Sequence, residues 1–369
     1  MEIGITGIGI ANPIYKQNQE RAVELVGNLL QLNSSEKKLL RALYKFTGIK
    51  YRYSVLADAC KIPGEFEFFP NNENETFPTT AARMQIYKDN ALTLALVAIQ
   101  NCLIKIQGFN KQDITHLVTV SCTGMYAPGL DIELVQQLGL KSNTKRTAIN
   151  FMGCYGAFNG IKIADAICRA DKQANVLVVC VEICTIHFQN KKDLDNLTSN
   201  AIFADGASCV LIQGEPKQNK YLGLTAFHCD LLPSSQQEMA WHIGDSGFDM
   251  ILTSYVPEAI ASGIPFFVKE LMKNLELTLE DIDYYAIHPG AKKILKACEK
   301  SLGINALQNR YSYNILENYG NMSSVTILFV LNLIWEDISL PEHHNKTIFG
   351  CAFGPGLTLE SMLLKTHYV

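Results

Sequence analysis

The sequence predicts an α/β protein made of two comparable halves, in each of which strands alternate with helices. Residues 176–184 and 207–213 are apolar almost throughout, which is typical of strands buried on both faces of a sheet. Residues 91–106 are apolar almost all round, as expected for a helix enclosed between layers. A similar series of elements begins again near Tyr221. These three observations favour a layered fold over a bundle or a barrel.

Length and composition favour an enzyme of one large or two moderate domains. The 369 residues can bury a sizeable core. With a net charge of −4 and 48% hydrophobic residues, nothing indicates nucleic-acid binding or disorder. Residues 1–10 alternate like a strand and lack the features of a signal peptide, and the apolar run 327–335 is far shorter than the ~20 residues of a membrane span. The 11 cysteines are interpreted as reduced thiols, which predicts a cytoplasmic protein.

The first half begins with the strand at 1–10, and leucines at helical spacing follow across 18–45. Residues 63–78 are polar and are typical of an exposed loop. The enclosed helix at 91–106 then leads to a short apolar strand at 116–122.

The second half repeats the alternation of strands and helices. Its elements are a strand at 221–229, helical stretches between 257 and 277, a strand at 284–287, a helix at 291–302, a helix after Asn321, and strands at 347–352 and 357–364. No internal sequence repeat accompanies this order, so the duplication is inferred from the elements alone. We place the boundary between domains at 1–215 and 216–369.

A single thiol lies where a helical pattern begins. Cys154 follows Gly153, and apolar residues recur at helical spacing from Phe158 onward. Unpaired N–H groups and the helix dipole favour thiolate over thiol at such a position. Most of the 11 cysteines are expected to be structural, because a free cysteine packs as a small hydrophobe. Its position makes Cys154 the candidate nucleophile.

Three other short stretches combine a reactive or turn-forming residue with small neighbours. His288 ends an apolar strand against Pro289-Gly290. Asn321 lies before the pair Ser323-Ser324, which can open an apolar helix. Residues 353–356 form a tight turn between two strands. Alone, each stretch is explained by packing, capping or a turn.

Together and in this order, the four stretches resemble the signature of type III polyketide synthases, the chalcone-synthase-like branch of the thiolase-fold condensing enzymes. The resemblance runs over nearly the whole chain. It includes Gly153-Cys154-Tyr155, His288-Pro289-Gly290, the Y-G-N-M-S-S segment at 319–324 and the G-P-G turn at 354–356. Ala352 replaces the first glycine of the family's G-F-G-P-G loop. The resemblance implies a thiolase-like fold with αβαβα layers.

The resemblance also implies a catalytic set of Cys154, His288 and Asn321, and the chemistry suits these residue types. A carbon–carbon bond made from two thioesters needs one acyl group held on a nucleophile while the other becomes a carbanion. Cysteine holds the acyl group as a reactive thioester. His288 would hold the thiolate, and with Asn321 it would donate to the oxygen that gains charge when malonyl-CoA loses carbon dioxide. No metal, flavin or nicotinamide is expected.

Supporting positions follow from the same resemblance. Phe203 falls at an aromatic gatekeeper, and Ser254 aligns near a second gatekeeper that is phenylalanine in chalcone synthases. Further substrate-binding positions are Cys122, Ala127, Cys184, Ser323, Gly354, Pro355 and Gly356. Candidates to meet CoA phosphates are Arg41, Lys45, Lys50, Lys292 and Lys293, for which solvated surface charge is the alternative. A serine and an alanine in place of bulky side chains favour long fatty acyl-CoA starters.

Three other functions remain open. The order Cys, His, Asn also occurs in papain-like hydrolases, but no C-G-[SA]-C-[WY] signature is present. A ketoacyl-ACP synthase III-like enzyme shares the fold and the catalytic set. If the chain were a thiolase-fold protein retained only for binding, we would expect one or more of the three catalytic residues to be replaced. We expect a homodimeric acyltransferase that extends an acyl-CoA starter with malonyl-CoA and releases a pyrone, resorcinol or related product, with no nucleic-acid partner and no membrane span. The dimer rests on fold analogy.

Overall fold

The computed structural model describes residues 2–273 and 275–368. Nine strands form one mixed sheet: β1 (Gly4–Ala11), β4 (His116–Ser121), β5 (Lys145–Asn150), β6 (Asn175–Ile183), β7 (Asp205–Gln213), β8 (Lys220–Leu231), β11 (Tyr284–Ile287), β12 (Thr347–Gly354) and β13 (Thr358–Tyr368). Their order is β11-β12-β13-β8-β1-β7-β6-β4-β5. Two ribbons lie outside it, β2 (Tyr15–Asn18) with β3 (Tyr51–Ser54) and β9 (Met239–Gly244) with β10 (Gly247–Leu252).

The sheet contains the same pattern twice. In the first half, β1 pairs antiparallel with β7, β7 antiparallel with β6, and β6 parallel with β4. In the second, β8 pairs antiparallel with β13, β13 antiparallel with β12, and β12 parallel with β11. β1 and β8 join the halves as an antiparallel pair. The predicted duplication is therefore present in the topology.

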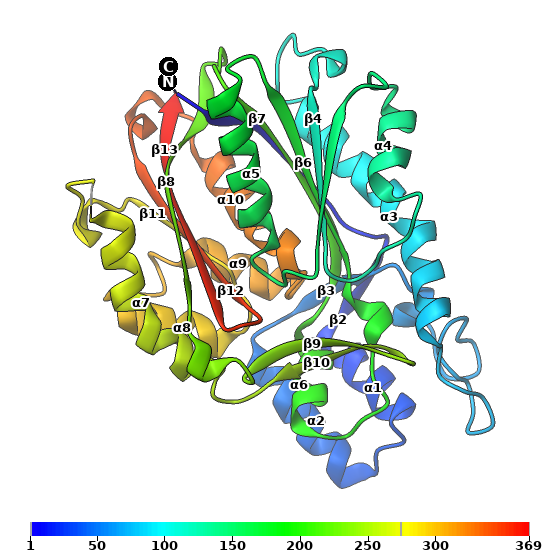
Figure 1. Ribbon diagram of the computed structural model, residues 1–369. Helices are drawn as coiled ribbons and strands as arrows, with labels where there is room; N and C mark the ends of the chain where they lie inside the picture. The colour runs from blue at the N-terminus through cyan, green and yellow to red at the C-terminus, as the bar shows by residue number, and fades with distance from the viewer. Residues whose placement is uncertain (1, 274, 369) are drawn as a thin grey trace.

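Helices separate and cover the two halves of the sheet. They are α1 (Gln19–Leu29), α2 (Ser34–Thr47), α3 (Thr80–Leu103), α4 (Leu130–Leu138), α5 (Gly156–Ala170), α6 (Leu194–Ile202), α7 (Val256–Met272), α8 (Lys292–Leu302), α9 (Arg310–Tyr319) and α10 (Thr326–Asp337). Figure 1 shows α5 and α10 between the two parts of the sheet. α5 contacts β4, β6 and β13, while α10 contacts β1, β7 and β11. With α3 packed outside the first half and α7 outside the second, the layers are αβαβα, as predicted.

The local sequence explains where several helices begin. α3 starts earlier than the apolar run at 91–106 indicates, because the side chain of Thr79 accepts a hydrogen bond from the backbone N–H of Ala82. The leucine-rich stretch at 18–45 is divided into α1 and α2, because Asn33 and Glu36 form a capping box that starts a second helix. The apolar run at 327–335 lies within α10, whose residues are buried almost all round.

The predicted domain boundary falls in the link between β7 and β8. The division into two domains stays a prediction, because strands of both halves pair in one sheet. Among the residues that the structure describes, no helix combines the length and the apolar character needed to cross a bilayer.

Candidate active site

The three predicted catalytic side chains converge from both halves. Cys154 lies two residues before α5, the central helix of the first half, with Tyr155 as the N-cap between them. His288 follows β11, and Asn321 lies between α9 and the single turn Ser323–Val325 that leads into α10. All three are buried, with exposures of 7% for Cys154 and 2% each for His288 and Asn321. The repeated topology therefore brings the starts of the two central helices to one place.

The backbone around Cys154 is held in a restricted conformation. Gly153 has a φ of +82°, and a Cβ built on it would lie 2.4 Å from Cδ of Pro355. Phe151 also has a positive φ, +61°, which is uncommon for a residue with a side chain. The N–H of Gly153 donates to Sγ of Cys122 at 2.9 Å. Cys122, which was predicted to line the cavity, thus also holds in place the loop that carries Cys154, called here the nucleophile loop.

Asn321 presents its amide nitrogen to the thiol. Nδ2 of Asn321 lies 4.0 Å from Sγ of Cys154 and donates to the carbonyl of Gly290 at 3.2 Å. Oδ1 accepts from the backbone N–H of Ser323 at 2.8 Å. Oδ1 is also 4.0 Å from Sγ of Cys154, so the orientation of the amide is fixed by its bonds to Ser323 and Gly290. Its N–H₂ group is available to an oxygen placed beside Cys154.

His288 shares a small cavity with Cys154 and Asn321. This cavity is also lined by Phe203 and Leu252. Within the described residues, neither ring nitrogen of His288 has a hydrogen-bond partner. Burial lowers the pKa of His288 to about 3, so the ring is neutral and offers one N–H donor and one lone pair.

Burial dominates the ionisation of the candidate nucleophile. It raises the pKa of Cys154 to about 12, against the opposing hydrogen bonds of Ser323 and Asn321. A position close to a helix N-terminus therefore does not by itself give Cys154 a low pKa in this arrangement. Desolvation, the largest cause, outweighs the hydrogen bonds that favour the thiolate.

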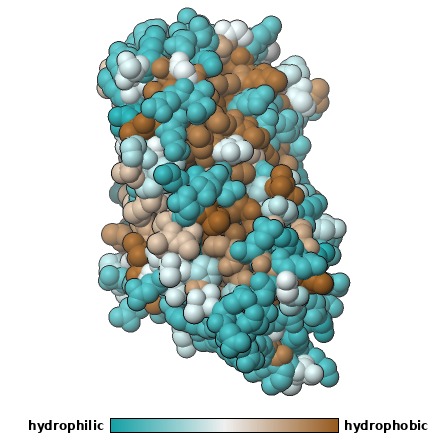
Figure 2. Space-filling model, turned by 90° about the vertical axis from the view of Figure 1, so that its right-hand side faces the viewer, coloured by the Kyte–Doolittle hydropathy of each residue, from teal (hydrophilic) through white to brown (hydrophobic). Residues whose placement is uncertain are grey.

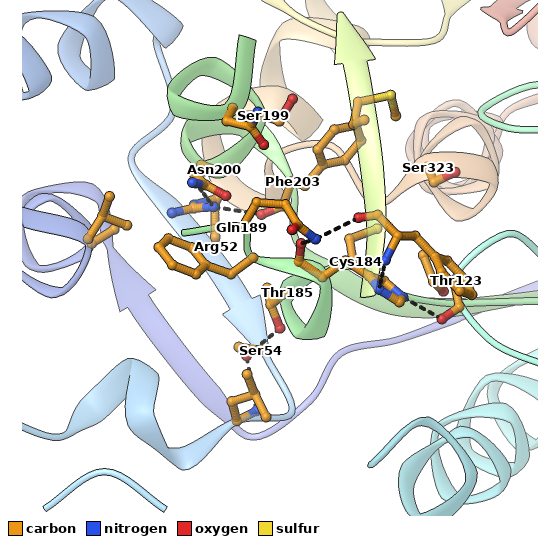
Figure 3. Close-up of a pocket in the computed structure, with 18 of the residues that line it drawn as sticks. Arg52, Ser54, Thr123, Cys184, Thr185, Gln189, Ser199, Asn200, Phe203 and Ser323 are labelled. Carbon is orange, nitrogen blue, oxygen red and sulfur yellow. Dashed lines mark hydrogen bonds between the residues drawn. The ribbon is translucent and has the colours of Figure 1, made fainter. Parts of the chain in front are cut away.

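A larger cavity opens on the other side of Phe203. It shares Cys154, Phe203, Met239 and Met250 with the small one. Phe203 therefore stands where the two cavities meet, in agreement with a gatekeeper. The predicted substrate positions Cys122, Cys184, Ser323 and Pro355 also line the large cavity. Figure 3 shows Phe203 with Cys184 and Ser323 around it.

Two glycines of the 354–356 turn shape it instead of lining the cavities. A Cβ on Gly354 would lie 2.5 Å from the ring of Tyr155, so only glycine allows this approach. Gly356 has a φ of +126°, a conformation that side chains rarely adopt. The turn between β12 and β13 thereby presses Pro355 against the nucleophile loop.

The structure contradicts the predicted cavity position of Ser254, and it does not place Ala127 at a cavity of this chain. Ser254 is exposed in the turn between β10 and α7 and lines neither cavity. Met250 and Leu252 line the small cavity instead, because alternate residues of a strand share one face and β10 ends at Leu252. Ala127 is exposed in the loop before α4 and lines neither cavity of this chain.

The five basic residues predicted to meet CoA lie outside both cavities. Arg41 forms an ion pair with Glu24 at 2.7 Å, and Lys50 pairs with Glu317. The other three lie close to where α2 ends and α8 begins. Lys45 is in the last turn of α2, Lys292 lies against Gly48, and Nζ of Lys293 is 5.5 Å from the ring centre of Phe46.

No role was predicted from the sequence for Glu182, a buried carboxyl group close to the site. Glu182 on β6 is fully buried, and burial raises its pKa. It accepts hydrogen bonds from the N–H of Cys122 at 3.0 Å, Oγ1 of Thr123 at 2.8 Å and Oγ of Ser324 at 2.5 Å. Glu182 thus connects the first half to the turn that follows Asn321. Its signal in the sequence is a lone acidic residue in an apolar strand.

Comparison with known proteins gives matches over the whole site. Residues 3–216 match the family described as chalcone and stilbene synthases, N-terminal domain, and residues 224–367 match the corresponding C-terminal domain. The alpha-pyrone synthesis polyketide synthase-like Pks18 of Mycobacterium tuberculosis is 28% identical over 97% of this chain and 90% of its own length.

Two further similarities extend the comparison. The probable polyketide synthase 1 of Dictyostelium discoideum is 30% identical over 98% of this chain, but the chain spans only 11% of that protein. The crystal structure of PKS-I from the brown alga Ectocarpus siliculosus superimposes with a TM-score of 0.89 at 28% identity, covering 99% of this chain and 98% of that one.

Proposed function

This chain belongs to the chalcone and stilbene synthase family of type III polyketide synthases, which are condensing acyltransferases, and from that premise we propose how its own residues act. Cys154 takes an acyl group from an acyl-CoA starter, and malonyl-CoA extends it by decarboxylative condensation. The observation that carries this proposal is the small cavity, which a thiol, a neutral imidazole and a fixed amide line together. Within the described residues, the imidazole has no hydrogen-bond partner.

Loading begins with a proton transfer. The lone pair of His288 accepts the proton of the Cys154 thiol, and the thiolate attacks the thioester carbonyl of the starter. The carbon–sulfur bond to CoA breaks, and the CoA thiolate recovers the proton from the imidazolium. The acyl group is left on Cys154 as a thioester, and His288 is neutral again.

Extension uses the donors of the second half. When malonyl-CoA loses carbon dioxide, the electron pair of the broken bond delocalises onto the thioester oxygen. An N–H of His288 and the amide of Asn321 donate to this oxyanion; removing one such donor typically costs about 2.7–4 kcal/mol of barrier. The enolate carbon then attacks the acyl group on Cys154 and releases the thiolate. No metal or redox cofactor takes part in this sequence of steps.

The large cavity supports a fatty acyl starter. Ser254 no longer supports it, because this residue lines neither cavity. Helix α1 lines the large cavity with Ala22, Leu25, Val26 and Leu29. Each buried CH₂ contributes about 0.8 kcal/mol, so this wall favours a long aliphatic chain over a phenylpropanoid group. The name of the mycobacterial relative refers to alpha-pyrone synthesis, which supports a pyrone as the product, with a resorcinol as the alternative ring closure.

A homodimer is supported by the edge of the sheet. β5 ends the strand order, and all but one of its residues are exposed. An unpaired edge strand is a template for pairing with another chain. Figure 2 shows apolar side chains gathered on the side of the molecule where α3 and α4 lie.

The eleven cysteines are all unpaired, which supports a reducing, cytoplasmic compartment.

The test is to incubate the purified protein with malonyl-CoA and a series of acyl-CoA starters, and to identify products by mass. Extended products in the absence of a carrier protein are expected, with long-chain starters used best. Release of free fatty acid alone would favour a thiol hydrolase. A requirement for malonyl-ACP would favour a ketoacyl-ACP synthase III-like enzyme. The Cys154→Ala protein serves as the control.

A further inference from the structure

The large cavity has two walls of opposite character. Helix α1 contributes the apolar stripe Ala22, Leu25, Val26 and Leu29, and α6 contributes Asn196, Ser199 and Asn200, followed by Phe203. Each set has the spacing i, i+3, i+4, i+7 of one helix face. The two helices are in contact. One cavity therefore offers an aliphatic surface along α1 and a polar surface along α6.

Two polar groups of the α6 stripe have no partner. Oγ of Ser199 and Nδ2 of Asn200 are buried and make no hydrogen bond within the described residues, and Ser199 is only 8% exposed. A buried polar atom without a partner costs about 1–3 kcal/mol. Such atoms in a cavity wall are explained if a ligand completes them.

Other polar side chains around the same cavity are already satisfied. Nε2 of Gln17 donates to the carbonyl of Ala59 at 2.9 Å. The hydroxyls of Ser54 and Thr185 lie 2.7 Å apart in a hydrogen bond. Asn196, on the same stripe of α6, donates to the carboxylate of Asp193 at 3.0 Å. The two unpaired groups are thus a local feature of α6.

The unpaired groups lie on the side of Phe203 that faces away from the small cavity. Phe203 lines both cavities, whereas Ser199 and Asn200 line only the large one. Arg52 fixes this end of α6, because its Nη1 donates to the carbonyls of Asn200 at 2.8 Å and Phe203 at 2.6 Å. One helical turn, about 5.4 Å, separates the unpaired groups from the gatekeeper. Figure 3 shows them across the cavity from Cys184 and Ser323.

We propose that Ser199 and Asn200 form a polar subsite for the keto oxygens of the growing chain. This inference rests on the proposed function and refines it. Each extension adds one carbonyl, a hydrogen-bond acceptor, whereas an aliphatic starter tail has none. The hydroxyl of Ser199 and the amide of Asn200 supply donors. The α1 wall holds the tail while the α6 wall holds the ketones, so the subsite favours further extension over early release.

The test uses Ser199→Ala, Asn200→Leu and the double variant with malonyl-CoA and one long-chain starter. Products are separated by chromatography and identified by mass, and amounts are divided by the fraction of enzyme that carries starter. The ratio of longer to shorter polyketides is expected to fall about three- to tenfold, the effect of losing one or two neutral hydrogen bonds. Thr198→Ala, on α6 but outside both cavities, is the matched control and keeps the wild-type ratio.

Conservative variants separate hydrogen bonding from packing. Ser199→Thr and Asn200→Gln keep a donor, so their product ratios are expected to stay near wild type. An unchanged ratio in the double variant overturns the subsite. Equal shifts in Asn200→Gln and Asn200→Leu overturn it as well, because the amide would then act only through its volume. Absence of any extension by the wild-type protein is a different result and contradicts the proposed function itself.

Discussion

The two halves of the sheet share a topology but contribute different chemistry. In the first, the start of α5 carries a thiol on a loop whose Gly153 has a positive φ and touches Pro355. In the second, the residues before α10 carry Asn321, whose amide is fixed from both sides. The same arrangement of strands and central helix therefore supplies a nucleophile once and a hydrogen-bond donor once. Because the topology is duplicated, the starts of α5 and α10 lie close together. The side chains at these two positions have different proposed roles.

Burial also shifts the pKa values of the reactive groups of the two halves in opposite directions. Burial raises the pKa of Cys154 to about 12 and lowers that of His288 to about 3. Both groups are then neutral, and a thiol from one half and a proton acceptor from the other line the same small cavity. We therefore expect a thiolate to form only when His288 takes the proton.

Removing the nucleophile gives the largest expected effect. Cys154→Ala is expected to abolish starter loading and product formation, because this sulfur is the only proposed acyl carrier. Intact-protein mass spectrometry measures the loading, and thermal unfolding checks that the variant is folded. A starter still attached covalently to the Cys154→Ala protein would show that the nucleophile is elsewhere.

Removing the imidazole tests the link between the halves. His288→Ala is expected to slow both loading and malonyl-CoA decarboxylation, each by roughly 10²–10⁴-fold. It also removes the group that stabilises the thiolate, so the apparent pKa of Cys154 rises. The rate of Cys154 alkylation by iodoacetamide, followed against pH, should therefore move to higher pH. A profile identical to that of wild type would contradict the pairing.

Removing the amide separates the two steps. Asn321→Ala is expected to lose malonyl-CoA decarboxylation by roughly 10²–10³-fold, while loading of Cys154 falls much less, because the amide serves mainly the oxyanion. Carbon dioxide release and intact mass give the two rates. Asn318→Ala, on α9 and outside both cavities, is the control. Equal losses of loading and decarboxylation would refute this division.

Narrowing the small cavity gives the smallest effect. Leu252→Phe adds bulk to the wall of the small cavity that Phe203 also lines. The value of kcat/KM for long-chain starters is expected to fall by about tenfold or less, within the range for one side-chain change in an apolar pocket. Ser254→Phe, in the exposed turn two residues later, should change nothing. If only the Ser254 variant altered starter choice, the assignment of Leu252 would be wrong.

The sequence was informative where a local pattern decides the structure. The apolar strands and central helices follow from residue patterns such as 176–184 and 327–335, and the catalytic set follows from four short motifs in a recognisable order. Ser254 was misplaced because its assignment rested on alignment with the family, and the local sequence does not show that β10 ends at Leu252 with Met250 and Leu252 on the cavity wall. The register of β10 is set by its pairing with β9.

The cavity walls were missed for a different reason. The stripes on α1 and α6 have ordinary helical spacing, and a stripe that faces a cavity has the same pattern as one that faces the core. The burial that raises the pKa of Cys154 was not predicted, because helix position is a local property, whereas burial depends on the whole fold. Such quantities need the packed structure.

The central claim, that the first half carries the acyl group and the second half acts on it, is tested most directly by locating the acyl group. Wild-type protein is mixed with a fatty acyl-CoA, quenched in acid and digested, and the peptides are sequenced by mass spectrometry. We expect the acyl mass on Cys154 and its loss when malonyl-CoA is added before quenching. An acyl group on another residue, or one on Cys154 that malonyl-CoA leaves unchanged, would contradict the account.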